Sequence, residues 1–444
     1  MPDLLPSLTI DGAELPPPVL GRAVDRLTAE LQACGAGPGR LVILSDPAPL
    51  PIVVATFAAG NLGAPLALTS GWSAVKPPAW AEVRTDGTVR RSPSWPPAPL
   101  DADIALVLFT SGSTGEPRAV ALSHRSIAYQ GRATADHLRI GPDDRLMLPL
   151  PLHHAYGMSV LQACRHAGAR LYVEGAFGAG TVLRRIAEEH VTAMDGIPSM
   201  YRILGREAAR DDRVRRALAS VRIRGCGGDL LSPVLRETFE RQTGGRLHDG
   251  YGLTEAGPNV AINTPHDYRE GTVGRPLAGT SIRVTAREIE VSGPGVMLGH
   301  LDLSTGKIQR DAFTRDGWLR TGDLGDIDDD GFLTVEGRSK NVLIVQGETV
   351  APAVLEDVMR GAAGVSDVAV VAGGGGARGD RVLVFAECEP AADSGSVLAR
   401  LREVCRRALP PLLRPDEIHF VDGLPRTASG KLDRIALETL AARR

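Results

Sequence analysis

Hydrophobic and polar positions in the first hundred residues alternate between helical and extended spacing. Apolar residues recur at helical intervals over Val19–Ala33 and are contiguous over Leu41–Leu44, as in a buried strand. The apolar run Pro51–Leu68 is interrupted by glycine, asparagine and proline, which predicts a buried helix followed by a strand and not a membrane span. Gly71–Pro99 is rich in proline, serine and arginine and predicts a loop. Residues 1–100 are therefore predicted to form a short α/β segment.

Strand and helix patterns alternate regularly between residues 104 and 275. Helices are predicted over Ser126–Ala135 and Thr181–His190. Short buried strands are predicted over Arg145–Leu148, Arg170–Val173, Ala193–Ile197 and Val221–Gly225. This alternation predicts a mainly parallel sheet flanked by helices.

The periodicity changes after residue 279. Short strands separated by turns predict a small β subdomain over residues 279–335. After Gly337 the pattern indicates a compact α+β tail, with strands over Val342–Val345, Val368–Val371 and Val382–Glu387, helices over Ala353–Gly361 and Val397–Ala408, and a flexible turn at Gly373–Gly376. We therefore expect an α/β protein with a large N-terminal domain, residues 1–337, and a small C-terminal domain, residues 338–444.

Composition excludes several classes of protein. The 444 residues are 43% hydrophobic and 23% charged, as in ordinary globular proteins, and the net charge of −3 provides no basic surface for nucleic acid. The first residues, MPDLLPSLTIDG, do not resemble a signal peptide. The five cysteines are scattered without CxxC spacing, which argues against a disulfide framework or a zinc site. We expect a cytoplasmic protein that does not insert into membranes.

Lysine is scarce in this chain. Only four of the 50 basic residues are lysine: Lys76, Lys307, Lys340 and Lys431. In a chain that otherwise uses arginine, each lysine is a candidate for a role that arginine cannot fill, although chance retention is the simpler explanation for Lys76 and Lys307.

A loop rich in glycine, serine and threonine, TSGSTGEPR, spans residues 110–118 between two apolar runs. Its backbone N–H groups and hydroxyls suit phosphate oxygens, and its glycines allow a close approach of the backbone. It is not the GxxxxGK[ST] nucleotide loop, because no Gly-Lys-Ser/Thr follows the glycines. Taken alone, the segment is equally consistent with a simple hairpin turn.

Six further segments follow this loop: PLHHAYGM (151–158), YGLTE (251–255), GPGVMLG (293–299), LRTGDLG (319–325), GRSKNVLIVQGE (337–348) and PRTASGK (425–431). Each is weak alone, but together and in this order they resemble the adenylate-forming superfamily of acyl- and aryl-CoA ligases, peptide-synthetase adenylation domains and firefly luciferase. The resemblance implies attack of a carboxylate on the α-phosphorus of ATP, giving acyl-AMP and pyrophosphate. Such a reaction needs cations and N–H donors around the triphosphate.

The resemblance assigns the phosphate contacts. Arg118 would add charge, Thr254 would contact the α-phosphate, and Glu255, with Thr114, would bind Mg²⁺ through hard oxygen atoms. The β- and γ-phosphates would lie on Thr110, Ser111, Gly112, Ser113, Thr114 and Gly115. Arg118 and Ala119 stand where the family usually has lysine and glycine, so the charge is kept but its reach differs.

The nucleoside contacts are implied in the same way. Tyr251 would offer an aromatic face to adenine, and Asp323 would accept both ribose hydroxyls. The residues expected to line the rest of the nucleotide site are Gly228, Asp229, Asp249, Gly250, Gly252 and Arg338. The structural alternatives are that Glu255 and Thr254 cap a helix and that Asp323 is a turn residue.

Three residues of the tail are assigned to movement and to the second half-reaction. Lys431 lies in a polar loop, and the matching lysine of the family bridges the carboxylate and the α-phosphate during adenylation. Lys340 matches the hinge, and the absence of a side chain at Gly347 would leave room for a pantetheine arm. The alternatives are a solvated surface lysine at 431 and a simple turn glycine at 347.

The positions that match the family's acyl-side wall imply an acid pocket lined by His154, Tyr156, Asp195, Cys226 and Gly227. His153 and His154 are predicted not to form a metal pair, because neighbours on a strand point to opposite faces. The segment 151–158 lacks the aspartate with which amino-acid adenylation domains hold an α-ammonium group. Asp195 ends an apolar strand and needs a partner, either an amine or hydroxyl of an aromatic or β-amino acid substrate, or a backbone N–H or arginine of the protein.

The sequence therefore predicts ATP- and Mg²⁺-dependent activation of a small carboxylic acid, followed by transfer to a thiol, CoA first of all. The alternatives are loading of a carrier-protein phosphopantetheine, a phosphotransferase, activation of a non-carboxylate oxyacid, and a non-catalytic homologue. The N-terminal segment is short for the family. The acid, the thiol acceptor and the oligomeric state stay open.

Overall fold

The computed structural model describes the chain except for residues 1–4, 70–78, 85–86, 92–98, 112–116, 340–341, 346–347, 377–378, 390–391, 427–431 and 443–444. The described helices include none with the length and apolar character that crossing a bilayer requires.

The described chain forms two compact units. The first comprises Met1–Asp229, Phe239–Thr321 and Ile327–Thr334, and the second comprises Leu230–Thr238, Gly322–Asp326 and Val335–Arg444. The two short segments in the second unit differ from the expected division at residue 337. Contacts within that unit account for the difference, because Ser232 donates a hydrogen bond to Asp357 and the Ser339 N–H donates to the Gly322 carbonyl.

A nine-stranded sheet in the first unit has the order β15-β14-β13-β12-β11-β9-β10-β1-β2. Its central strands are parallel, as predicted: β9 (Arg145–Leu148), β10 (Arg170–Val173), β11 (Ala193–Gly196), β12 (Ile223–Cys226) and β13 (His248–Gly252). The edge strands are β1 (Ser7–Ile10), β2 (Ala13–Leu15), β14 (Asn259–Ile262) and β15 (Arg275–Pro276). Strand β1 joins the start of the described chain to this sheet, because it pairs in parallel with β10.

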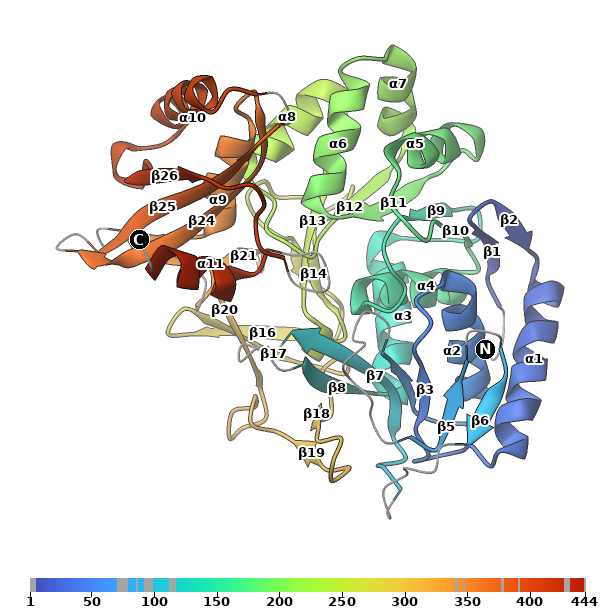
Figure 1. The fold of residues 1–444 in the computed structure, drawn as a ribbon. Helices are drawn as coiled ribbons and strands as arrows, with labels where there is room; N and C mark the ends of the chain where they lie inside the picture. Colours follow the sequence, from blue (N-terminus) through green and yellow to red (C-terminus); the bar gives the residue numbers. More distant parts are fainter. Residues whose placement is uncertain are drawn as a thin grey trace. The chain divides into compact units, whose positions relative to one another are not determined.

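Helices alternate along the chain with the strands of this sheet. They are α3 (His124–Leu138), α4 (Ala155–Ala167), α5 (Ala179–Glu188), α6 (Pro198–Ala208), α7 (Asp212–Ser220) and α8 (Pro233–Thr243), and η1 (Thr254–Ala256) is a short 3₁₀ turn. Helices α5, α6 and α7 pack against one another (Figure 1). Helix α4 was not predicted, because it is buried on nearly all sides and so lacks an amphipathic period.

The second sheet of this unit has eight strands in the order β19-β18-β8-β7-β4-β3-β5-β6. They are β3 (Val42–Leu44), β4 (Leu66–Leu68), β5 (Ala81–Val83), β6 (Val89–Arg91), β7 (Ile104–Ser111), β8 (Pro117–Ser123), β18 (Gly299–Leu301) and β19 (Ile308–Gln309). Helices α1 (Pro17–Ala33) and α2 (Pro49–Asn61) pack together beside strands β3, β4 and β6 (Figure 1).

Strands β5 and β6 correct the prediction of a loop over residues 71–99. Trp80 directly precedes β5, and its indole N–H donates to the Cys34 carbonyl at 2.8 Å. The guanidinium groups of Arg40 and Arg91 lie over its ring, at 4.4 and 4.5 Å from the centroid. These contacts hold β5 against β3, so distant residues supply the strand pairing that local composition does not indicate.

A four-stranded sheet, in the order β16-β17-β20-β21, contains β16 (Ser281–Thr285), β17 (Glu288–Ser292), β20 (Leu319–Ile327) and β21 (Leu333–Arg338). It forms part of the β subdomain predicted over residues 279–335. Strands β18 and β19 of that segment instead extend the eight-stranded sheet, because β18 pairs with β8.

The C-terminal unit contains a sheet of β22 (Leu343–Val345), β23 (Glu348–Val350), β24 (Val365–Gly376), β25 (Gly379–Cys388) and β26 (Glu417–Phe420), with α9 (Pro352–Arg360), α10 (Ser394–Ala408), α11 (Arg434–Ala442) and the 3₁₀ turn η2 (Pro411–Leu413). Alternate residues of β24 enter two apolar cores, Val370 with α9 and α10 and Val371 with α11. Both faces of this sheet are thus covered (Figure 1). The predicted turn at Gly373–Gly376 is wrong, because these residues end β24 and Gly376 pairs with Gly379.

Candidate active site

The carboxyl ends of strands β11, β12 and β13 bring the predicted pocket residues together. The register pairs Asp195 with Gly225 and Cys226 with Asp249. Asp195 therefore lies beside Gly225, and Cys226 and Asp249 lie side by side one residue further along at the same edge of the parallel sheet, with Gly227 directly after. This edge is where open α/β sheets bind their ligands.

Asp195 is held by a tyrosine that the sequence analysis assigned to the same pocket. The Tyr156 hydroxyl donates to Asp195 Oδ1 at 2.8 Å, and the aspartate is only 8% exposed. The protein partner is thus neither the backbone N–H nor the arginine that we had expected. Burial raises the pKa of Asp195 to about 6, against the opposing effect of the Tyr156 hydrogen bond. Burial and the aspartate together raise the pKa of Tyr156.

Small residues around this pair make room for it. A Cβ atom on Gly225 would lie 2.3 Å from Asp195 Oδ1, and one on Gly227 would lie 3.3 Å from the Tyr156 ring. Tyr201, which the sequence analysis missed, donates its hydroxyl to the carbonyls of Met194 and Gly225 at 3.0 and 2.9 Å. It ties β11 to β12 and so fixes the strand end that carries Asp195. Its position in α6, just after β11, is a signal that would have found it.

His153 and His154 do not lie on a strand, so the reason given for separating them was wrong. They precede α4, and their ring centroids are 4.5 Å apart with the planes tilted by 46°. Burial lowers the pKa of His153. Within the part of the chain that the structure describes, no cluster of three or more His, Cys, Asp or Glu side chains has the arrangement of a metal site.

Glu255 lies in η1, at the end of β13, and two other segments hold its loop. The Met297 N–H donates to the Glu255 carbonyl at 2.8 Å. The Gln130 side-chain amide of α3 donates to the carbonyls of Ala256 and Asn259 at 3.1 and 3.0 Å. Tyr251 and Thr254 belong to the same segment, where Tyr251 is largely buried and Thr254 is half-buried.

His300 is a residue of this site that the sequence analysis missed. Its Nε2 atom lies 3.8 Å from Glu255 Oε1, and its Nδ1 atom lies 3.5 Å from Asp311 Oδ1. The side chain is almost fully buried, and Glu255 raises its pKa. Its signal in the sequence is a lone polar aromatic residue directly after GPGVMLG, at the start of an otherwise apolar strand.

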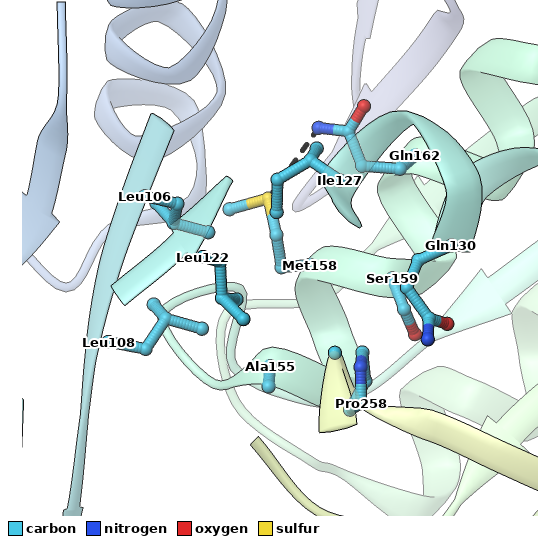
Figure 2. A pocket seen from close by; sticks show the side chains of 11 residues that line it. Leu106, Leu108, Leu122, Ile127, Gln130, Ala155, Met158, Ser159, Gln162 and Pro258 are labelled. Atoms are coloured by element: carbon cyan, nitrogen blue, oxygen red, sulfur yellow. Dashed lines mark hydrogen bonds between the residues drawn. The ribbon is translucent and has the colours of Figure 1, made fainter. Parts of the chain in front are cut away.

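A small cavity lies between β7, β8, α3 and α4, next to the Glu255 loop. Figure 2 shows leucine side chains on one side and Gln130 with Ser159 on the other. The Gln162 amide lies 3.8 Å from the sulfur of Met158, one turn earlier on α4. It has room for about one water molecule, so it does not provide space for an acyl chain.

The strands that flank the predicted phosphate loop pair as a hairpin. Thr110 on β7 is opposite Arg118 on β8, and Ser111 is opposite Pro117. The part of the loop that contains Gly112, Ser113, Thr114 and Gly115 lies outside the described residues. Lys340, Gly347 and Lys431 also lie outside them.

In the C-terminal unit Asp323 is buried and Arg338 is exposed, and the Arg338 Nε atom donates to Asp323 Oδ1 at 3.2 Å. In the first unit Gly228, Asp229 and Gly252 are exposed, and Gly250 is half-buried on β13. Asp323 therefore has a charged partner that the sequence analysis assigned to the same nucleotide.

Comparisons with known families cover most of the chain. Residues 67–301 match the AMP-binding enzyme family, and residues 355–431 match the AMP-binding enzyme C-terminal domain.

Three relatives are named as CoA ligases or a CoA synthase. The chain is 33% identical to a sulfoacetate–CoA ligase of Cupriavidus necator, over 78% of this chain and 68% of that protein. It is 31% identical to a feruloyl-CoA synthase of Amycolatopsis, over 93% of this chain and 91% of that protein. It spans 62% of the length of a long-chain fatty acid–CoA ligase of Salmonella typhimurium.

Solved structures share the fold. An o-succinylbenzoate CoA synthetase of Bacillus subtilis, in complex with its acyl-adenylate, aligns with a TM-score of 0.79 at 24% identity, over 97% of this chain and 95% of that one. An anthranilate CoA ligase in complex with anthranoyl-AMP aligns with a TM-score of 0.80 at 22% identity, over 98% and 94%. The chain belongs to the AMP-binding enzyme family, among the AMP-forming acid–thiol ligases of the adenylate-forming superfamily.

Proposed function

We propose that the chain is an aryl-CoA ligase for an aromatic acid that carries a hydroxyl or amino group. It uses ATP to activate the acid as acyl-AMP, releases pyrophosphate and transfers the acyl group to CoA. The observation that carries the choice of acid is the buried pair of Tyr156 and Asp195 at the carboxyl edge of the sheet. The feruloyl-CoA synthase relative, which aligns over nearly the whole chain, supports an aromatic substrate.

The pair of Tyr156 and Asp195 would favour substrates that carry a hydrogen-bond donor. Tyr156 occupies Asp195 Oδ1, whereas no described residue donates a hydrogen bond to Oδ2. A hydroxyl or amine on the substrate ring would satisfy this second oxygen. An acid without such a group would cover this oxygen without pairing it, which costs about 1–3 kcal/mol. The pair therefore discriminates by about 10- to 100-fold in kcat/KM.

The test is a pyrophosphate-release assay at pH 8, where Asp195 is ionised, with matched pairs of acids. Benzoate and cinnamate are compared with their hydroxyl and amino derivatives. We expect the derivatives to be preferred by wild type, and Asp195→Ala to lose most of that preference. Asp143→Asn, an exposed aspartate of the same unit, is the matched control. An unchanged substrate profile in Asp195→Ala would contradict the proposed role.

Glu255 suits Mg²⁺, because a carboxylate is a hard oxygen donor and the backbone of its loop is fixed by Gln130 and Met297. Bound Mg²⁺ would neutralise charge on the triphosphate. Thr254, Arg118 and Thr114 complete the proposed set around the phosphates.

Lys431 is proposed to act in the adenylation half-reaction. Lys431→Ala is expected to lose pyrophosphate exchange while retaining ATP binding, since the lysine would act on the reacting groups and not on the adenosine. Undiminished adenylation in this variant would remove Lys431 from the mechanism.

The alternative acceptor is the phosphopantetheine of a carrier protein. The same assay with CoA, with a loaded carrier protein and with neither separates the two acceptors. Pyrophosphate as the product, in place of ADP or phosphate, separates either one from a phosphotransferase.

A further inference from the structure

His300 is the buried polar side chain next to the proposed Mg²⁺ ligand. It is 6% exposed, and among the described residues its Nε2 atom has no hydrogen-bond partner. Glu255 Oε1 lies 3.8 Å from this atom. This separation is longer than a hydrogen bond, so the two side chains would have to approach for one to form. A buried ring nitrogen that faces a carboxylate without a hydrogen bond needs an explanation, because an unmet polar group costs free energy.

The backbone fixes the place of His300. It lies on β18, directly opposite Val120 of β8, and Arg118 lies two residues from Val120 on the same face. Asp311 contacts the other ring nitrogen at 3.5 Å. The imidazole is therefore held by its strand and by Asp311 while its free nitrogen faces Glu255.

The segment that carries His300 also holds the backbone of Glu255. The Met297 N–H binds the Glu255 carbonyl, three residues before His300. The carbonyl oxygen of Gly295 lies 2.2 Å from where a Cβ atom on Gly257 would be, so the two loops pack backbone against backbone. One segment thus sets both the main chain and the side-chain environment of Glu255.

We propose that His300 is a positioning residue that orients the Glu255 carboxylate for Mg²⁺ by donating its Nε2–H to it. This inference rests on the proposed adenylation reaction. Partners of this kind hold a ligating carboxylate in one orientation, and their loss typically weakens metal binding by about 10- to 100-fold.

The test measures equilibrium binding of α,β-methylene-ATP by calorimetry, with and without Mg²⁺, so that no turnover is needed. In His300→Ala we expect the Mg²⁺ concentration that gives half of the maximal change in nucleotide binding to rise about 10- to 100-fold. Binding of the nucleotide without Mg²⁺ should stay unchanged. His300→Gln keeps an N–H donor and is expected to restore most of the affinity. His300→Phe keeps the ring volume without the donor and is expected to resemble His300→Ala. His266→Gln, an exposed histidine of the same unit, is the matched control.

The outcomes are distinct. If wild type shows no Mg²⁺-dependent nucleotide binding, the proposed function fails and the inference falls with it. If nucleotide binding depends on Mg²⁺ equally in wild type and in His300→Phe, the Nε2–H donor is not needed. That result overturns the inference about His300 and leaves the proposed function standing. Equal weakening of binding with and without Mg²⁺ in all three variants also overturns it, because His300 would then only fill space.

Discussion

Asp195, the proposed recognition residue, carries a cost in stability. Its carboxyl group is buried among small residues, and its pKa of about 6 lies above the ordinary value of 3.8. The folded protein therefore holds this proton more tightly than the unfolded chain does. Between pH 3.8 and about 6 the contribution of Asp195 to stability falls as the pH rises. Above pH 6 the ionised group costs about 3 kcal/mol.

Asp195→Asn is therefore expected to raise the melting temperature at pH 8, because the amide needs no ionisation and still accepts from Tyr156. The gain should shrink as the pH falls towards 4, because the folded protein then holds the aspartate protonated. Thermal unfolding of both proteins across this range measures it. A stability difference that does not vary with pH would mean that the Asp195 pKa is not raised.

At the scale of elements, the approach of the Glu255 loop to the glycine turn of residues 293–299 sets the geometry of the proposed Mg²⁺ site. Gly257 has a φ of +96°, and a Cβ atom there would overlap the Gly295 carbonyl oxygen. No other residue type fits without moving one loop away from the other.

Backbone strain alone costs about 1–3 kcal/mol, and we expect Gly257→Ala to destabilise the protein by more than this. We also expect the variant to weaken Mg²⁺-dependent nucleotide binding. Gly271→Ala is the control, because Gly271 also has a positive φ, +79°, but nothing lies within 4 Å of the added atom. Melting temperatures and nucleotide titrations compare the two. Equal effects of both variants would show that strain, and not loop packing, decides the result.

The whole chain is divided into two units, and each has its own apolar core. In the C-terminal unit Leu355 of α9 is fully buried against β24 and β25, together with Val370 and Val384. Removing most of such a side chain costs about 2–5 kcal/mol. If the two units unfold separately, such a loss of stability should affect the unfolding of the C-terminal unit alone.

Leu355→Ala is expected to lower one unfolding transition by several degrees and to leave the other unchanged. Ile435→Ala, at an exposed position of the same unit, should change neither. Scanning calorimetry distinguishes these results. A single transition that shifts as a whole would show that the two units unfold together.

Much of this architecture follows from local pattern. The strands Arg145–Leu148 and Arg170–Val173 have the bounds predicted for them, because contiguous apolar residues at those lengths suit buried parallel strands. Helix α4 and strands β5 and β6 were missed for the opposite reason. Their identity depends on burial from all sides and on pairing with distant residues, which no local period records.

The sequence by itself determined the α/β class and the order of the motifs, because these depend on residue type and spacing along the chain. The resemblance that those motifs carry indicated Tyr156, Asp195 and Glu255. Only the tertiary structure decided which side chains meet. The pairing of Tyr156 with Asp195, 39 positions apart, and the contact of His300 with Glu255 depend on strand register and on loops from different sheets. Such contacts are set by packing of the whole unit, and no pattern within one segment contains them.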